Sequence, residues 1–142
     1  MADNVENKTE NSTEKEKNKF NWVTQRAACT LPIVFKTLIL QVEEDVKTRN
    51  GLRPANSPYE FFVEENGPDF TVILKAKGVQ RIVKFTLAEH AILVSDDAGH
   101  SMFEVTLTFN DKGECKLNVN KEEHDYWQVR RMALEELLFH AN

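Results

Sequence analysis

The C-terminal part of the chain has apolar residues at the spacing of an amphipathic helix. At 100° per residue they form one stripe on a helix, which consists of Trp127, Leu134, Leu137, Leu138 and Ala141. Asp125, followed by Gln128 three residues later, is typical of a helix start because both side chains can bind free backbone N–H groups. The pattern therefore predicts a helix over residues 125–139.

A second helical pattern lies near the N-terminus, over residues 21–49, and Asn50-Gly51 is typical of a helix end. Pro32 lies inside this pattern and lacks a backbone N–H. It either kinks one long helix or follows a short helix, in which case Thr30 caps the second one. An unbroken helix would carry four residues on its reverse side: Trp22, Cys29, Ile33 and Leu40.

The middle of the chain consists of short runs rich in Phe, Val, Ile, Leu and Thr, separated by turn residues. Such runs are typical of β-strands, and these short loops connect only antiparallel neighbours. We predict a meander of five or six strands over residues 59–65, 70–76, 79–87, 90–95, 102–109 and 115–119. The fold class is then α+β, with an N-terminal helix, an antiparallel sheet and a C-terminal helix packed on the sheet.

This order of elements resembles the helix-grip fold of steroid-transfer-like proteins and, more distantly, the folds of secretion chaperones. The strand that precedes the first helix in the helix-grip fold is missing from this sequence. The resemblance implies an architecture, and an architecture alone does not define a function.

Residues 1–19 differ in composition from the rest, since most of them are Asn, Glu, Lys, Thr or Ser. Such a segment cannot bury enough apolar surface to offset the entropy that ordering removes. We expect a disordered tail over residues 1–19 and a single domain over residues 20–142.

Charge and cysteine content narrow the classes of partner and compartment. A net charge of −5, without a cluster of Lys and Arg, argues against nucleic-acid binding. No apolar run is long enough to span a membrane, and the first residues lack the apolar stretch of a secretory signal. We expect a cytoplasmic protein with reduced thiols at Cys29 and Cys115, the latter as a small core residue.

Each predicted helix carries one charge inside its apolar stripe, Asp45 in the first helix and Arg130 in the second. A lone buried charge costs several kcal/mol, so it must be paired or hydrated. Both side chains could reach solvent, with Asp45 also contacting Arg49 one turn away. Alternatively, Arg130 pairs with Asp45 and fixes how the helices dock. In a third hypothesis, Arg130 binds an anionic ligand head between Tyr126 and Trp127.

The predicted strands carry apolar residues on both faces, which is unusual for an antiparallel sheet with one solvated face. On the second face, each of the first four strands contributes one residue to a band: Phe62, Ile73, Ile82 and Ile92. Four such side chains approach the largest apolar patch that a soluble monomer exposes. The reverse side of the first helix, closure of the sheet around a cavity, or a second copy of the chain could cover this band.

No residue pattern indicates an enzyme. The sequence lacks a glycine-rich phosphate loop, a GxSxG motif and an HExxH motif. His90 and His100 flank a turn that contains Asp96 and Asp97, but this turn sequence is ordinary and sets no ligand geometry. The sequence therefore gives no support for a metal, a cofactor or a catalytic residue.

These features favour a binding or interaction module without catalytic activity. We expect a protein partner, or a second copy in a homodimer, to dock on the apolar sheet face. The alternative is a carrier of a small apolar or amphipathic ligand. That ligand would lie in a cavity between sheet and helices, with its head group near Arg130, Trp127 and Tyr126.

Overall fold

The computed structural model describes residues 20–140 of the chain. The predicted tail, residues 1–19, and Ala141 of the predicted C-terminal stripe lie outside the described residues. None of the helices in the described part has the length and apolar character that a membrane crossing requires.

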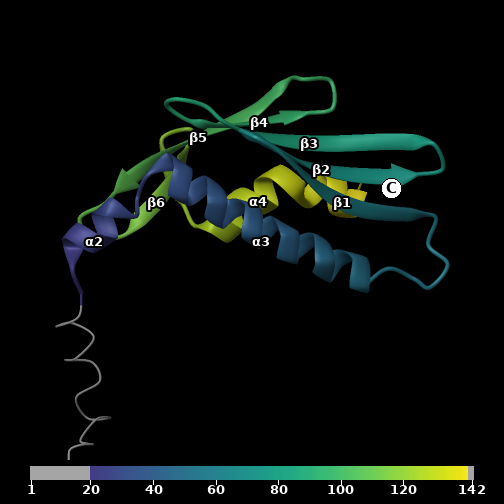
Figure 1. Ribbon diagram of the computed structural model, residues 1–142, viewed down its shortest axis with the longest axis horizontal. Helices are drawn as coiled ribbons and strands as arrows, with labels where there is room; N and C mark the ends of the chain where they lie inside the picture. Colours follow the sequence, from purple (N-terminus) through teal and green to yellow (C-terminus); the bar gives the residue numbers. More distant parts are fainter. Residues whose placement is uncertain (1–19, 141–142) are drawn as a thin grey trace, which may run out of the picture.

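Within residues 20–140, two helices precede the sheet, α2 (Trp22–Ala27) and α3 (Leu31–Gly51) (Figure 1). The break between them falls at Thr30, which is the N-cap of α3. Pro32 then lies in the first turn of α3, where its missing N–H removes no helical hydrogen bond. Of the two alternatives that the sequence leaves open, the split helix is the one that forms.

Seven strands follow, and each pairs antiparallel with the next one in the sequence. Their bounds are β1 Tyr59–Asn66, β2 Asp69–Ala76, β3 Val79–Leu87, β4 Ile92–Asp96, β5 Ser101–Phe109, β6 Cys115–Val119 and β7 Glu122–His124. The predicted α+β class and the antiparallel meander are confirmed, although the sheet has seven strands rather than five or six. The extra strand, β7, consists of Glu-Glu-His and so has no apolar pattern to reveal it.

The last helix of the described residues is α4 (Tyr126–Glu135), which continues as a π-helical turn, η1 (Glu136–His140). The predicted start is confirmed, because the Asp125 N–H donates to Gln128 Oε1 at 2.8 Å. The π-helical turn leaves both Leu137 and Leu138 buried.

The helices α3 and α4 lie on the same face of the sheet (Figure 1). The hydrophobic core lies between these helices and the strands. The aromatic rings of Phe70 and Phe85 stack in this core with centroids 4.4 Å apart. The largest fully buried side chains include Val34, Leu38 and Val42 of α3, Phe61, Phe70 and Phe85 of the sheet, and Ile92, Val94, Val105 and Leu117 farther along it. This packing places α3 and α4 next to each other on one face of the sheet.

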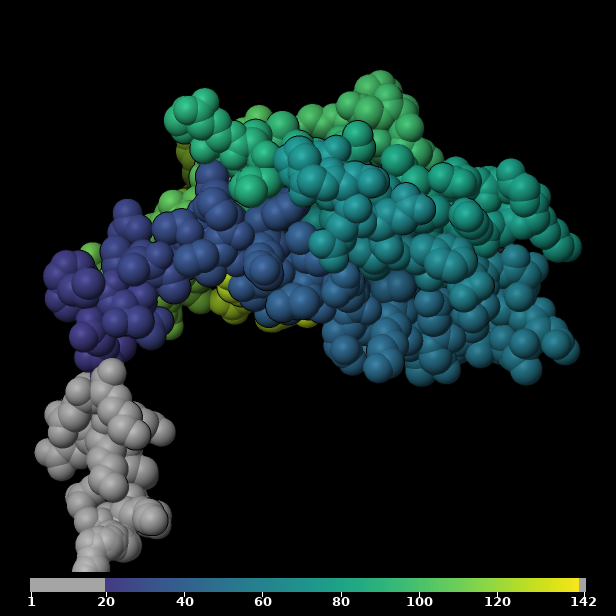
Figure 2. Space-filling model, viewed as in Figure 1, coloured from purple at the N-terminus to yellow at the C-terminus, as the bar shows by residue number. Residues whose placement is uncertain are grey.

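A disulfide joins Cys29, in the bend between α2 and α3, to Cys115 at the start of β6, with Cα atoms 5.5 Å apart. The prediction of reduced thiols is therefore wrong. The two cysteines are 86 residues apart in the sequence, and nothing in that spacing shows that the fold brings them together. The ring of Phe20 also packs on Gly113, where a Cβ atom would lie 2.5 Å from Phe20 Cζ. Since α2 buries no residue of its own, these contacts hold it on the β5–β6 hairpin, next to α3 (Figure 2).

Candidate functional site

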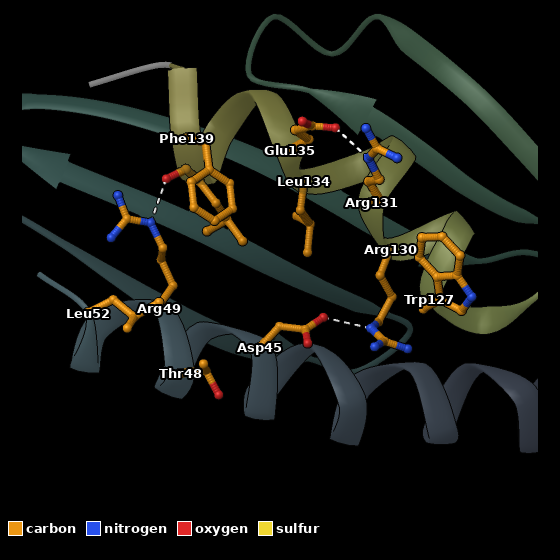
Figure 3. A pocket seen from close by; sticks show the side chains of 11 residues that line it. Asp45, Thr48, Arg49, Leu52, Trp127, Arg130, Arg131, Leu134, Glu135 and Phe139 are labelled. Carbon is orange, nitrogen blue, oxygen red and sulfur yellow. Dashed lines mark hydrogen bonds and ion pairs between the residues drawn. The ribbon is translucent and has the colours of Figure 1, made fainter.

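The two charged residues within the apolar stripes form an ion pair that joins α3 to α4 (Figure 3). Arg130 Nε donates to Asp45 Oδ2 at 2.6 Å, and Arg130 Nη1 donates to Gln41 Oε1 at 2.7 Å. The side chains of Arg130 and Asp45 are 18% and 34% exposed, so the pair lies at the border between core and solvent. The structure thus brings together the two residues that the sequence singled out, and Asp45 does not bond to Arg49.

A groove of about 400 Å³ opens beside this ion pair, between α3 on one side and α4 with η1 on the other. Trp127 lies at one end of the groove, and Leu52 and Phe139 lie at the other (Figure 3). The α3 wall consists of Asp45, Thr48, Arg49 and Leu52, and the α4–η1 wall of Trp127, Arg130, Arg131, Leu134, Glu135, Leu138 and Phe139. Apolar atoms make up most of the surface that lines the groove, and charged groups are spaced along it.

Three large apolar side chains at the groove are open to solvent, since Leu52 is 68%, Trp127 54% and Phe139 57% exposed. Burial in the core explains the other apolar residues of the groove, Leu134 and Leu138, but not these three. Exposed aromatic residues next to arginines are typical of protein interfaces, where Trp, Tyr and Arg contribute most of the binding energy.

Arg49 lies against three aromatic rings, two from β1 and one from η1. Its guanidinium carbon is 4.9 Å from the ring centroid of Phe139, 5.3 Å from that of Phe61 and 5.6 Å from that of Tyr59. Arg49 Nε donates to the Leu138 carbonyl oxygen at 2.8 Å, and Arg49 Nη2 donates to the Tyr59 hydroxyl at 3.4 Å. The hydrogen bond from Arg49 lowers the pKa of Tyr59 below its usual value, because it stabilises the phenolate.

The other two guanidinium groups of the groove already have carboxylate partners. Arg130 is paired with Asp45, and Arg131 Nε lies 2.7 Å from Glu135 Oε1. This second contact lowers the pKa of Glu135. No carboxylate of residues 20–140 lies within 4.0 Å of the Arg49 side chain. Among residues 20–140, the groove thus has three guanidinium groups and two carboxylates, and the guanidinium without a carboxylate partner is that of Arg49.

Two of the three predicted ligand-binding residues, Arg130 and Trp127, line the groove. Tyr126 does not line the groove but packs against the core, and this burial raises its pKa. From the sequence, Arg49 was identified only as a residue that Asp45 could contact one helical turn away. Its position becomes visible only when β1 and η1, which supply the aromatic rings, are placed next to α3.

Three residues of the predicted sheet band lie side by side, since Phe62 pairs with Ile73 and Ile73 pairs with Ile82 across β1, β2 and β3. Ile92 does not join them, and its assignment to the band is corrected. Ile92 pairs with Leu87 and Val105 on the opposite face and is fully buried in the core.

The band exposes less apolar surface than the sequence suggests. Phe62 is exposed, with Lys75 Nζ 5.3 Å from its ring centroid, whereas Ile82 is partly buried and Ile73 is buried between its neighbours. The first helix does not cover the band, because it lies on the other side of the sheet with Trp22, Ile33 and Leu40 exposed.

The histidines of the β4–β5 region are exposed, and each lies near one carboxylate. His90 Nε2 is 3.8 Å from Glu89, and His100 Nδ1 is 3.9 Å from Asp96. In the part of the chain that the structure describes, no three His, Cys, Asp or Glu side chains are grouped so that they could hold a metal ion.

Comparisons of the chain with protein-family models, with curated proteins and with solved structures find no match. The resemblance to the helix-grip fold therefore stays a likeness in the order of elements. A functional conclusion has to come from the geometry of the groove and of the sheet face.

Proposed function

We propose that this protein is a non-enzymatic binding module, and that the groove between α3 and α4–η1 takes an amphipathic helix of a partner protein. The main support is the group of three exposed apolar side chains, Leu52, Trp127 and Phe139, placed around an apolar groove. Burying them against a partner would remove apolar surface from water, which is the dominant favourable term in protein association.

The dimensions of the groove support a helix as the bound element. Trp127 and Phe139 are twelve residues apart on α4 and η1, which at 1.5 Å per residue corresponds to roughly 15–20 Å. A helix of about 12 residues has the same length. Docking of an amphipathic helix into an apolar groove between helices is a recurrent mode of peptide recognition.

The alternative of a small-ligand carrier has less support. Carrier cavities bury most of the surface of their ligand, whereas the space between sheet and helices is filled with core side chains. Arg130, the residue expected to hold the head group, uses its Nε and Nη1 on Asp45 and Gln41. A carrier would therefore have to use the open groove rather than an enclosed cavity.

A selection from a displayed library of peptides of about 12–16 residues tests the groove without a known partner. Selected peptides should have apolar residues at helical i, i+3, i+4 and i+7 spacing. The variant Leu52→Lys should lose these peptides, because it places a charge at the groove.

The matched control is Leu40→Lys, which changes a leucine of similar exposure (61%) on α3 that does not line the groove. This variant should retain the selected peptides. Enrichment of peptides that bind wild type and Leu52→Lys equally well would contradict the proposal.

Self-association as a homodimer through the sheet face is a second candidate, and the order of charges on that face favours it. Beside the apolar row, the cross-strand row Glu64, Thr71 and Lys84 runs from a negative to a positive end. A two-fold axis parallel to the strands would place β1 opposite β3 of the second copy. Glu64 would then face Lys84, and Phe62 would face Ile82.

The predicted cytoplasmic location stays a prediction. The disulfide between Cys29 and Cys115 favours an oxidising compartment instead, because such bonds are rare where glutathione and thioredoxin keep thiols reduced. The state of the two thiols in protein purified from its native compartment, trapped with an alkylating reagent, distinguishes the two locations.

A further inference from the structure

We infer that Arg49 binds a carboxylate of the partner helix, so that the preferred partner is an acidic amphipathic helix. This inference rests on the proposed function of the groove and adds the chemistry that selects the partner. It is based on the unused hydrogen-bonding capacity of Arg49, on its surroundings, and on the pairing of every other guanidinium in the groove.

Arg49 does not use all of its hydrogen-bond donors within residues 20–140. A guanidinium carries five N–H donors, and Arg49 uses one on the Leu138 carbonyl and one on the Tyr59 hydroxyl. The remaining three have no partner among residues 20–140. A carboxylate can accept two parallel N–H bonds from a guanidinium, which is the strongest and most directional contact that this group makes.

The bonds to Leu138 and Tyr59 also hold the Arg49 side chain in place before a ligand arrives. Further restraint comes from the aromatic rings of Phe61 and Phe139. Because the side chain is already ordered, an incoming carboxylate would cost little additional conformational entropy. The partly buried setting also weakens screening by salt and water, so a contact there is stronger than one on an open surface.

The charges around Arg49 select an acidic residue rather than a basic one. Arg130 and Arg131 already have carboxylate partners, so the groove charge that has no partner among residues 20–140 is the positive charge of Arg49. A basic residue of the partner placed at Arg49 would bring two like charges together. The overall net charge of −5 does not oppose this preference, because the contact is local.

A double-mutant cycle across the interface tests the inference. The probe is the strongest selected peptide, labelled with fluorescein, in its original form and with its acidic residue changed to the amide, Glu→Gln or Asp→Asn. Fluorescence anisotropy gives the Kd of each form for wild type and for Arg49→Gln. The loss of a charged hydrogen-bonded pair should weaken binding of the acidic peptide about tenfold, while the amide peptide should bind both proteins equally.

The control variant Lys47→Gln removes the same charge from α3 at an exposed residue outside the groove, and it should change the Kd less than about twofold. Arg49→Lys should recover only part of the affinity, because an ammonium lacks the two-pronged geometry. The comparison of the acidic and the amide peptide on the wild-type protein does not depend on any protein variant. The difference between these two Kd values therefore tests the inference even if Arg49→Gln unfolds.

Failure of the inference is distinguishable from failure of the proposed function. Peptides that require the groove but carry no acidic residue, or that bind equally after the amide change, would overturn the role of Arg49 and leave the groove proposal standing. A library that yields no groove-dependent peptide would overturn both.

Discussion

Replacing Arg130 with Met removes a charge from the ion pair that joins α3 to α4, so the partner carboxylate of Asp45 loses its closest cation. Two unit charges 4 Å apart attract by about 1 kcal/mol in water and by about 4 kcal/mol at an effective dielectric constant of 20. With side chains 18% and 34% exposed, the pair lies between these limits, and ordering two side chains offsets part of the gain. We expect a coupling free energy of about 1–2 kcal/mol between Arg130 and Asp45.

Urea unfolding of four proteins measures this coupling: wild type, Arg130→Met, Asp45→Asn and the double variant. Arg130→Met also removes the hydrogen bond to Gln41, but that loss occurs with and without Asp45 and cancels in the cycle. The coupling therefore reports the ion pair alone.

The neighbouring pair Arg131–Glu135 is a matched control on the same helix, because its side chains are 64% and 44% exposed. Exposed pairs at i, i+4 contribute about 0.3–0.5 kcal/mol. A coupling between Arg130 and Asp45 that is below about 0.5 kcal/mol, or no larger than that of the control pair, would refute this reasoning.

Three further predictions follow from other contacts. Reduction of the disulfide between Cys29 and Cys115 should lower the unfolding free energy by about 4–5 kcal/mol, the entropy of a closed loop of 86 residues; two thiols titratable in the untreated native protein would contradict the bond. In an ultraviolet absorbance titration, Tyr59 should ionise at lower pH than the other tyrosine, and Arg49→Gln should raise its pKa back toward the usual value; two tyrosines that titrate together would argue against the contact. Sedimentation equilibrium should show a dimer that Phe62→Lys converts into a folded monomer; a wild-type monomer at the highest soluble concentration would rule out association through the sheet face.

The helices and most strands could be predicted because their signals are local. Apolar spacing and turn residues define α4 and the strands β1 to β6, and Thr30 before Pro32 gives the alternative of a split helix. The strand β7 could not be predicted, since Glu122–His124 is stabilised by pairing with β6 rather than by apolar residues of its own.

The prediction that Ile92 lies on the second face of the sheet was wrong because the face depends on how neighbouring strands are connected. Side chains alternate along a strand, but a connection between strands resets which residue points to which face. Ile92 is therefore in the core, and Leu93, which pairs with Thr86 and Glu104, takes the second face.

The charged site was predictable only in part. One charge inside each apolar stripe marked Asp45 and Arg130 as residues that need a partner, because a buried charge is costly wherever the helix packs. Arg49 has no carboxylate partner among residues 20–140, and Cys29 is bonded to Cys115; both findings depend on which distant segments of the chain meet. No spacing in the sequence carries that information.

The most direct test of the groove uses the two tryptophans of the chain, Trp22 on α2 and Trp127 at the groove. Both side chains are more than half exposed, so each indole N–H gives a separate reporter in a nitrogen–proton correlation spectrum. On titration with the strongest selected peptide, the Trp127 signal should shift in proportion to the bound fraction while the Trp22 signal stays in place. A peptide that binds without moving the Trp127 signal, or that moves only the Trp22 signal, would contradict binding in the groove between α3 and α4–η1.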